Sequence, residues 1–243
     1  MTTIFSQETI SEFRRGAAGA VPIIMGYIPI GFAFGVLAAE SGIGLAGAVA
    51  MSVFVYAGSS QFIALGLIES GAAVSALGLT VFLVNLRHML MSASLAPYLG
   101  RFKGWQQALF SYELTDESFG VHSAALRSRI NPSPTRMISL NMCAQLSWVG
   151  SSAAGAWVGS RLFFDTAVFG LDYALPAMFI ALLVLQVESR RHLCIALLAA
   201  ALSVTLYLAG AGQWHLILAT LVTATVGLLT EKIPGRAAGR EQS

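Results

Sequence analysis

Charged residues are scarce in this sequence. Asp, Glu, Lys and Arg together make up 11% of its 243 residues, whereas hydrophobic residues make up 56%. Soluble domains carry about 25% charged residues, so the composition argues against a water-soluble domain. The net charge of +2 is too small to indicate a nucleic-acid partner. We therefore expect a membrane protein surrounded by lipid.

Cysteines and catalytic motifs are also scarce. The two cysteines, Cys143 and Cys194, lie in apolar stretches without metal-ligand spacing, so we expect neither a disulfide nor a metal site. The sequence has no Gly-x-Ser-x-Gly, no His-Glu-x-x-His and no Gly-x-x-x-x-Gly-Lys-[Ser/Thr] motif. These motifs mark hydrolases, zinc proteases and nucleotide-driven proteins. We therefore expect no enzyme, no cofactor and no ATP-driven pump.

Long uncharged runs predict membrane-spanning helices, which need about 20 apolar residues. The candidate runs are Ala17–Ala39, Leu45–Ile68, Ile138–Ser160 and His192–Leu208, with two shorter ones at Ala174–Val187 and Trp214–Leu229. We predict an all-α fold: a polytopic transmembrane helical bundle of about six to eight membrane segments, with broken or re-entrant helices. A single transmembrane domain would cover residues 17–230. Residues 1–16 and 231–243 would be cytoplasmic.

Basic clusters predict the orientation, because Lys and Arg favour the cytoplasmic side. The clusters are Arg14/Arg15, Arg101–Lys103 with Arg127–Arg136, Arg190/Arg191, and Lys232/Arg236/Arg240. Placing all of them inside puts both termini in the cytoplasm. The run from Leu45 would then return the chain to the cytoplasm at Glu69, and an even number of crossings would fit between Glu69 and Arg136.

Residues 72–130 permit two arrangements. In one, Ala72–Leu99 is a re-entrant hairpin bent near Asn85–His88, and the segment from Trp105 lies on or near the cytoplasmic face. In the other, Ala72–Leu99 is one long broken span, and Trp105–Leu126 returns through the protein. Charge placement favours the first arrangement.

Two spans contain residues that interrupt a regular helix. Pro29 removes a backbone donor in the middle of its run. In the next run, Tyr56-Ala57-Gly58-Ser59-Ser60-Gln61-Phe62 places small and polar residues at mid-span. Gly58 permits a break, and Ser59 or Ser60 could cap a second half-helix whose free N–H groups suit a carboxylate. The alternative is that the small residues only allow close helix packing.

Asn85-Leu86-Arg87-His88 places ionisable groups at membrane depth. A central Arg costs about 2.5–3.5 kcal/mol there unless it faces a polar interior or a partner. Arg87 and His88 point about 100° apart on a regular helix, so one would bind a ligand while the other pairs elsewhere. The alternative for Arg87 is a structural ion pair with an acid of Glu113–Glu117.

Three acids lie within Ser111–Phe119. If this segment is buried, Asp116 or Glu117 could carry a proton through a coupling cycle, and His88 is a third ion-coupling candidate. If it is a cytoplasmic loop, the acids are solvated residues at a helix start, with Thr115 or Asp116 as the N-cap.

Small residues suggest two further features. Gly31/Gly35 and Gly155/Gly159 each form a Gly-x-x-x-Gly stripe, which could receive a partner helix or pack within the chain. Trp148–Ser152 echoes Tyr56–Ser60 and hints at an inverted repeat.

Five motifs occur in an order that is familiar from one family. They are Phe13-Arg14-Arg15-Gly16, Pro29–Gly35, Tyr56–Phe62, Asn85–His88 and Leu114-Thr115-Asp116-Glu117. Together they resemble the AzlC family, the large subunits of branched-chain amino acid exporters linked to azaleucine resistance. The resemblance implies export of hydrophobic amino acids across the bacterial inner membrane, with a small AzlD-type subunit as partner.

The residues and the resemblance together predict a secondary exporter with alternating access around a midplane site. We expect the substrate to contact Tyr56, Gly58, Ser59, Ser60, Gln61, Asn85 and Arg87. A proton gradient is the simplest energy source. The alternative is a non-transporting subunit that scaffolds a larger complex, and the sequence is compatible with an oligomer.

Overall fold

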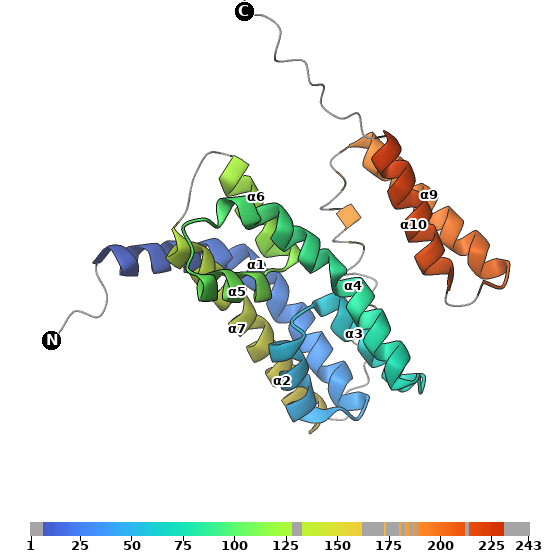
Figure 1. Ribbon diagram of the computed structural model, residues 1–243. Helices are drawn as coiled ribbons and strands as arrows, with labels where there is room; N and C mark the ends of the chain where they lie inside the picture. Colours follow the sequence, from blue (N-terminus) through green and yellow to red (C-terminus); the bar gives the residue numbers. More distant parts are fainter. Residues whose placement is uncertain are drawn as a thin grey trace, which may run out of the picture. The chain divides into compact units, whose positions relative to one another are not determined.

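The computed structural model describes residues 7–127, 133–161, 189–211 and 214–230, together with residues 173, 180, 183, 184 and 187. Regular structure in these residues is helical throughout, which confirms the all-α prediction (Figure 1). Most of the expected span Ala174–Val187 lies outside the described residues. The same holds for the expected tail, residues 231–243, with its basic cluster Lys232/Arg236/Arg240.

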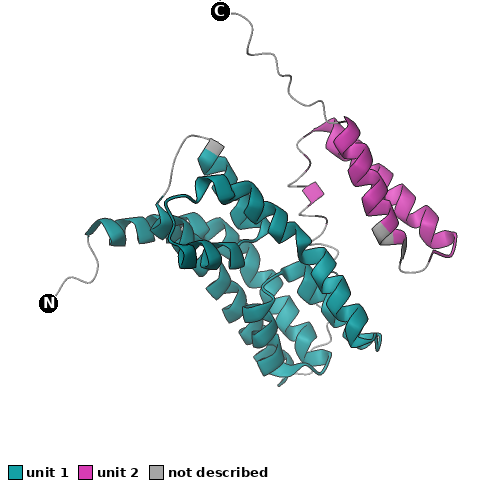
Figure 2. Ribbon diagram, viewed as in Figure 1, with its two compact units in different colours: residues 1–178 teal, residues 179–243 magenta. Residues whose placement is uncertain are grey.

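The chain divides into two compact units, residues 1–178 and 179–243 (Figure 2). The helices of the first unit are α1 (Gln7–Glu40), α2 (Gly44–Phe54), α3 (Gly58–Glu69), α4 (Val74–Leu95), the short 3₁₀ helix η1 (Ala96–Tyr98), α5 (Gly104–Tyr112), α6 (Asp116–Arg127) and α7 (Pro134–Gly159). The second unit contains the helix pair α9 (Arg190–Leu208) and α10 (Trp214–Thr230). The single domain expected over residues 17–230 stays a prediction.

Several helices have the length and composition of membrane spans. Among the described residues, Gln7–Glu40, Val74–Tyr98 and Arg190–Leu208 are long and apolar enough to cross a bilayer. α7 has 26 residues, or about 39 Å at 1.5 Å per residue, which exceeds the roughly 30 Å of a hydrocarbon core. The fold is therefore that of a polytopic helical membrane protein, as predicted.

α1 and α7 run parallel and form the centre of the first unit. Gly16 lies against Arg136 and Ser139 where both helices begin, and a Cβ added to Gly155 would overlap the carbonyl group of Phe32. Both Gly-x-x-x-Gly stripes face this contact, since Gly35 lies against the Ser152 backbone. The stripes let the backbones of α1 and α7 touch. This is the alternative in which they pack within the chain, and it leaves neither stripe free for a partner helix.

The expected interruption at Pro29 is not a break in the helix. α1 continues from Gln7 to Glu40 through both Pro22 and Pro29. Each proline still removes one N–H from the ladder, so the carbonyl four residues earlier loses its usual helical partner.

α2 and α3 form a re-entrant hairpin. Gln61 Nε2 on α3 donates to Ser52 Oγ on α2 at 3.2 Å, so the two helices lie antiparallel on either side of the turn at Tyr56–Ala57. Ser41 Oγ, just beyond α1, donates to Glu69 Oε1 at 2.5 Å. The hairpin therefore enters and leaves at the end where α1 finishes.

This hairpin corrects the predicted path of the chain. The run Leu45–Ile68 was expected to cross the membrane and reach the cytoplasm at Glu69. Instead the break reverses the chain, because Ser41 and Glu69 are in contact. A single crossing, and not an even number, then joins Glu69 to the segment that precedes α7.

That crossing is α4, which continues unbroken through Asn85–His88. α4 starts near Glu69. At its other end, Leu95 and the nearby Leu99 pack against Met137 and Ile138 at the beginning of α7. The hairpin predicted for Ala72–Leu99 is therefore wrong. The other arrangement is right in making this segment one span, although the helix is not broken.

α5 and α6 form a second re-entrant hairpin, which enters from the end where α7 begins. Phe102, just before α5, packs with Leu95 and Met137 at that end. The rings of Phe110 and His122 lie 5.0 Å apart on either side of the turn. Trp105–Leu126 therefore does not cross from one end of the first unit to the other, and the return predicted in the second arrangement is wrong. Its expected place on or near the cytoplasmic face stays a prediction.

The two hairpins are related by an inverted arrangement. α1 and α4 run antiparallel. The α2–α3 hairpin enters at the end where α1 finishes, and the α5–α6 hairpin enters at the opposite end, where α4 finishes. The tips meet, because the Tyr112 hydroxyl donates to the Val53 carbonyl. The architecture is an inverted repeat. Trp148–Ser152, the possible echo of Tyr56–Ser60, lies inside the continuous α7 and is not a second helix break.

Whereas Arg87 lies in the middle of α4 and Arg161 follows the end of α7, five basic residues of the first unit gather where α1 and α7 begin. We call this the basic end, defined by Arg14, Arg15, Arg101, Lys103 and Arg136. Ser133 Oγ donates to Glu12 Oε2 there at 2.7 Å and ties the start of α7 to α1. Because the α5–α6 hairpin starts and finishes at this end, the basic clusters on both sides of it stay together.

Candidate functional site

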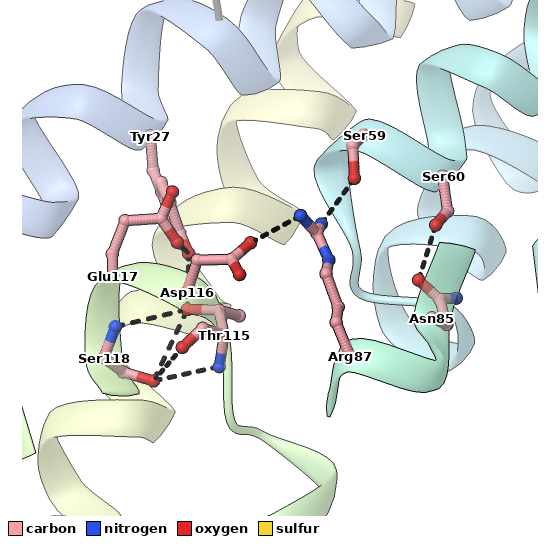
Figure 3. A network of polar contacts seen from close by, with 9 residues as sticks. All are labelled: Tyr27, Ser59, Ser60, Asn85, Arg87, Thr115, Asp116, Glu117 and Ser118. Carbon is pink, nitrogen blue, oxygen red and sulfur yellow. Dashed lines mark hydrogen bonds and ion pairs between the residues drawn. The ribbon is translucent and has the colours of Figure 1, made fainter. Parts of the chain in front are cut away.

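A polar network joins four elements halfway along the bundle (Figure 3). Its side chains come from α1, the start of α3, the middle of α4, and the start of α6. Tyr27 lies eleven residues beyond Gly16, the α1 residue that contacts the start of α7. That is about 16 Å along the helix, or half of a hydrocarbon core. The network therefore occupies the midplane of the first unit.

Arg87 links the two hairpins at the point where each turns back. Its Nη1 lies 3.0 Å from Asp116 Oδ2, and its Nη2 donates to Ser59 Oγ at 2.5 Å. The Arg87 and Asp116 side chains are 31% and 18% exposed, so the pair is poorly screened by solvent. Arg87 Nε is buried and has no hydrogen-bond partner among the described residues. The structural ion pair that the sequence left open is present.

The start of α6 is fixed by a reciprocal cap. The Thr115 N–H donates to Ser118 Oγ at 3.0 Å, and the Ser118 N–H lies 3.4 Å from Thr115 Oγ1. Thr115 is therefore the N-cap, one of the two candidates, and it is 6% exposed. Asp116 and Glu117 follow in the first turn, where a helix stabilises negative charge. They are not the solvated loop acids that the alternative described.

Tyr27 connects the acids to the α1–α7 core. Its hydroxyl oxygen lies 2.7 Å from Glu117 Oε2 and 2.8 Å from Thr115 Oγ1. Its ring meets Trp148 edge-on at 5.2 Å. Sequence reasoning missed Tyr27, although it is the one polar side chain in the run Ala17–Ala39.

The start of α3 differs from the prediction in its cap. The residue before the helix is Ala57, in extended conformation, and no side chain caps the first turn. The left-handed residue is Tyr56, with φ of 41°, and not Gly58. Neither Ser59 nor Ser60 is the N-cap, because both lie inside α3. Ser60 Oγ donates instead to Asn85 Oδ1 at 2.5 Å.

Gln61 has a different environment from the other predicted site residues. It is fully buried, and Trp148 Nε1 donates to its Oε1 at 2.9 Å. Its amide nitrogen donates to Ser52. Both ends of this amide hold the hairpin to itself and to α7, and its role in binding a substrate stays a prediction.

Two further predicted residues do not join the network. His88 is half-buried and makes no side-chain hydrogen bond with any described residue, in line with its expected divergence from Arg87. The Tyr56 side chain is 3% exposed, and its hydroxyl has no hydrogen-bond partner among the described residues. Glu113 Oε2 shares this condition at the tip of the other hairpin.

The family follows from a direct comparison. The family model described as AzlC protein matches residues 22–162. The chain belongs to the AzlC family. The matched range contains both hairpins and all nine residues of the network in Figure 3.

Relatives of this AzlC-family chain are named as membrane proteins or as a transport protein. Inner membrane protein YgaZ of Escherichia coli is 33% identical over 81% of this chain and 83% of its own length. The branched-chain amino acid transport protein AzlC of Bacillus subtilis is 30% identical over 90% of this chain and 85% of its own length. An uncharacterized membrane protein of Archaeoglobus fulgidus is 35% identical, over 73% and 77% respectively. No solved structure matches the chain.

Proposed function

We propose that this protein is a secondary transporter, and not an enzyme, which exports branched-chain or other hydrophobic amino acids across the bacterial inner membrane. The name of the Bacillus subtilis relative supports the substrate class. The architecture supports the mode of action, since broken helices and inverted repeats are typical of secondary transporters. The observation that carries the proposal is Arg87, held at the midplane between the first turns of α3 and α6.

The substrate carboxylate binds Arg87 and the start of α3. A carboxylate, that of Asp116, already occupies the guanidinium, so this position accepts the chemical group that an amino acid would bring. The first N–H groups of α3 have no side-chain cap and carry the partial positive charge of a helix N-terminus. Substrate binding would exchange one carboxylate for another on Arg87.

The apolar side chain of the substrate would be selected next to this site. Tyr56 and Phe62 are buried beside the start of α3, and Phe62 packs edge-on against Phe34 at 5.6 Å. Asn85, which holds Ser60, would complete the polar half of the pocket. A polar site beside aromatic residues suits an amino acid with a branched aliphatic side chain.

The hairpins serve as alternating gates in this proposal. The α2–α3 hairpin closes the site from one end, and α5–α6 closes it from the basic end. The positive-inside rule favours the cytoplasm for the basic end, and with it for the N-terminus; the basic cluster Lys232/Arg236/Arg240 favours the same side for the C-terminus. Export then begins with entry past α5–α6 and finishes with release past α2–α3.

A proton gradient would supply the energy, with His88, Asp116 and Glu117 as the ion-coupling candidates that the sequence offers. A small AzlD-type subunit would assemble with the chain in the bilayer. It would use a face other than the glycine stripes, because α1 and α7 cover these. The apolar side of α4 with exposed Leu79, Phe82 and Leu90 is a candidate face for such a partner.

Transport in proteoliposomes tests the proposal. The purified chain, alone and with its AzlD-type subunit, should exchange external labelled leucine for internal unlabelled leucine, and valine and isoleucine should compete. The rival is a non-transporting scaffold subunit. Folded protein that exchanges none of these amino acids, with or without the small subunit, would establish the rival instead.

A further inference from the structure

Glu113 is the most deeply buried acid in the described part of the first unit. It ends α5 at the tip of the second hairpin, and its residue exposure is 3%. Its Oε2 is buried without a hydrogen-bond partner. The next residue, Leu114, is 1% exposed. A carboxylate oxygen in the position of Oε2 has neither water nor a donor to stabilise a negative charge, so burial favours the protonated form of Glu113.

The groups that face Glu113 from neighbouring elements do not include a cation. Those close enough to interact electrostatically are Tyr56, at the tip of the first hairpin, and Cys143 on α7. Both are neutral near pH 7 in their ordinary state. Arg87, the cation of the network, contacts Asp116 and Ser59 instead. Glu113 also lies at the C-terminal end of α5, where the helix disfavours an anion.

The other two acids of the turn have polar partners that Glu113 Oε2 lacks. Asp116 contacts Arg87 at 3.0 Å, and Glu117 accepts from the Tyr27 hydroxyl at 2.7 Å. Both also occupy the first turn of α6, which favours the charged form. The turn between α5 and α6 therefore has one acid, Glu113, whose buried oxygen has no polar partner. Its two other acids, Asp116 and Glu117, are paired with Arg87 and Tyr27.

We propose that Glu113 is the proton-binding group that couples transport to the proton gradient; this inference rests on the proposed function. In the conformation described here the Glu113 carboxylate has taken up H⁺ and is a neutral carboxyl. When the hairpin tips move, the O–H bond breaks, H⁺ leaves to water on the side then open, and the carboxylate remains.

The contact between the tips gives Glu113 its link to the rest of the cycle. Tyr112, the preceding residue, donates to the Val53 carbonyl in the first hairpin. The Tyr56 hydroxyl, which is also buried without a partner, belongs to that hairpin too. Any opening that separates the tips therefore changes the surroundings of Glu113. Proton release and gate movement are coupled through one contact.

The test compares two activities in proteoliposomes. Glu113→Gln imitates the neutral carboxyl, so leucine exchange without a gradient should persist, while leucine accumulation driven by a pH gradient should fall to the level of protein-free liposomes. Glu113→Asp should restore gradient-driven accumulation. Glu8→Gln removes an exposed acid at the start of α1, outside the network, and should leave both activities unchanged.

Infrared spectroscopy supplies a second measurement that does not depend on transport. The protonated-carboxyl band of the wild-type protein at neutral pH should disappear in Glu113→Gln and persist in Asp116→Asn. Gradient-driven accumulation by Glu113→Gln at the wild-type level, or an unchanged band, would overturn the assignment while leaving the proposed transporter intact. If the wild-type protein exchanges leucine but its accumulation does not respond to the pH gradient, the proton-coupling inference fails and the proposed transporter function stands. If it exchanges no leucine, both fail.

Discussion

At the scale of single residues, the site is built from polar side chains that form hydrogen bonds and an ion pair with residues of both hairpins. Arg87 is the clearest case. The sequence left two readings open, a structural ion pair or a substrate ligand, and the structure contains the pair with Asp116. The readings do not exclude each other, because a guanidinium that holds an internal carboxylate can hold an external one in its place.

The first prediction concerns this guanidinium. Arg87→Met keeps most of the side-chain volume but removes the charge and the bidentate donors. We expect folded protein whose leucine exchange falls by about 100-fold or more, as for a lost charged contact of roughly 3 kcal/mol. Leucine exchange in proteoliposomes measures it, with Arg101→Met at the basic end as the control. Wild-type exchange by Arg87→Met would remove Arg87 from the site.

A second prediction concerns the hydroxyl of Tyr27. Tyr27→Phe keeps the edge-on contact with Trp148 but takes away the donor to Glu117. Leaving a buried acceptor without its partner costs about 1–3 kcal/mol. Unfolding in detergent should show this loss, whereas Tyr98→Phe, at an exposed tyrosine, should be neutral. Equal stability of the two variants would mean that Glu117 finds another donor.

At the scale of elements, the sequence predicted the positions of the helix breaks better than the direction of the chain after each break. The polar cluster at Tyr56–Phe62 and the cap at Thr115 were both recognised, and a turn lies at each. The left-handed residue proved to be Tyr56, which costs about 1–3 kcal/mol and persists only when the surroundings enforce it. Nothing in local propensity points to such a tyrosine.

The direction of the chain after a break is equally hidden from local patterns. A half-helix that continues and one that turns back have the same composition and the same cap signals. The difference lies in contacts far apart in sequence, such as Ser41 with Glu69 and Phe110 with His122. Hydropathy therefore predicted that Leu45–Ile68 crosses the membrane, although this run is divided between two antiparallel helices, α2 and α3.

The third prediction concerns the α1–α7 contact. Gly155→Ala places a methyl group against the Phe32 backbone, which cannot move aside as a side chain could. We expect a loss of about 1–3 kcal/mol, the usual cost of overpacking. Gly150→Ala, on the same helix in open space, should instead stabilise by about 0.5–1 kcal/mol through helix propensity. Detergent unfolding of both variants decides; a match between them would mean that the backbones are not in contact.

At the scale of the whole first unit, the inverted hairpins resolve a conflict that the sequence could not. Keeping all basic clusters on one side required an even number of crossings only because Leu45–Ile68 was treated as a span. With both hairpins re-entrant, α4 alone crosses between them. Arg101 and Lys103 still join Arg14 and Arg136 at the basic end. The charge pattern and the hydropathy pattern then agree.

The last prediction separates the two paths of the chain. The exposed residues Ser70, beyond the first hairpin, and Lys103, before the second, lie at opposite ends of the first unit; a straight span through Leu45–Ile68 would place both in the cytoplasm. We replace Cys143 and Cys194 by alanine and introduce Ser70→Cys or Lys103→Cys. A membrane-impermeant maleimide applied to intact cells should label the cysteine at position 70 and spare the one at 103. Inside-out vesicles should reverse the result, because the positive-inside rule puts the basic end in the cytoplasm. Labelling of both positions from the same side would show that α2–α3 crosses the membrane and that the inverted repeat does not exist in the bilayer.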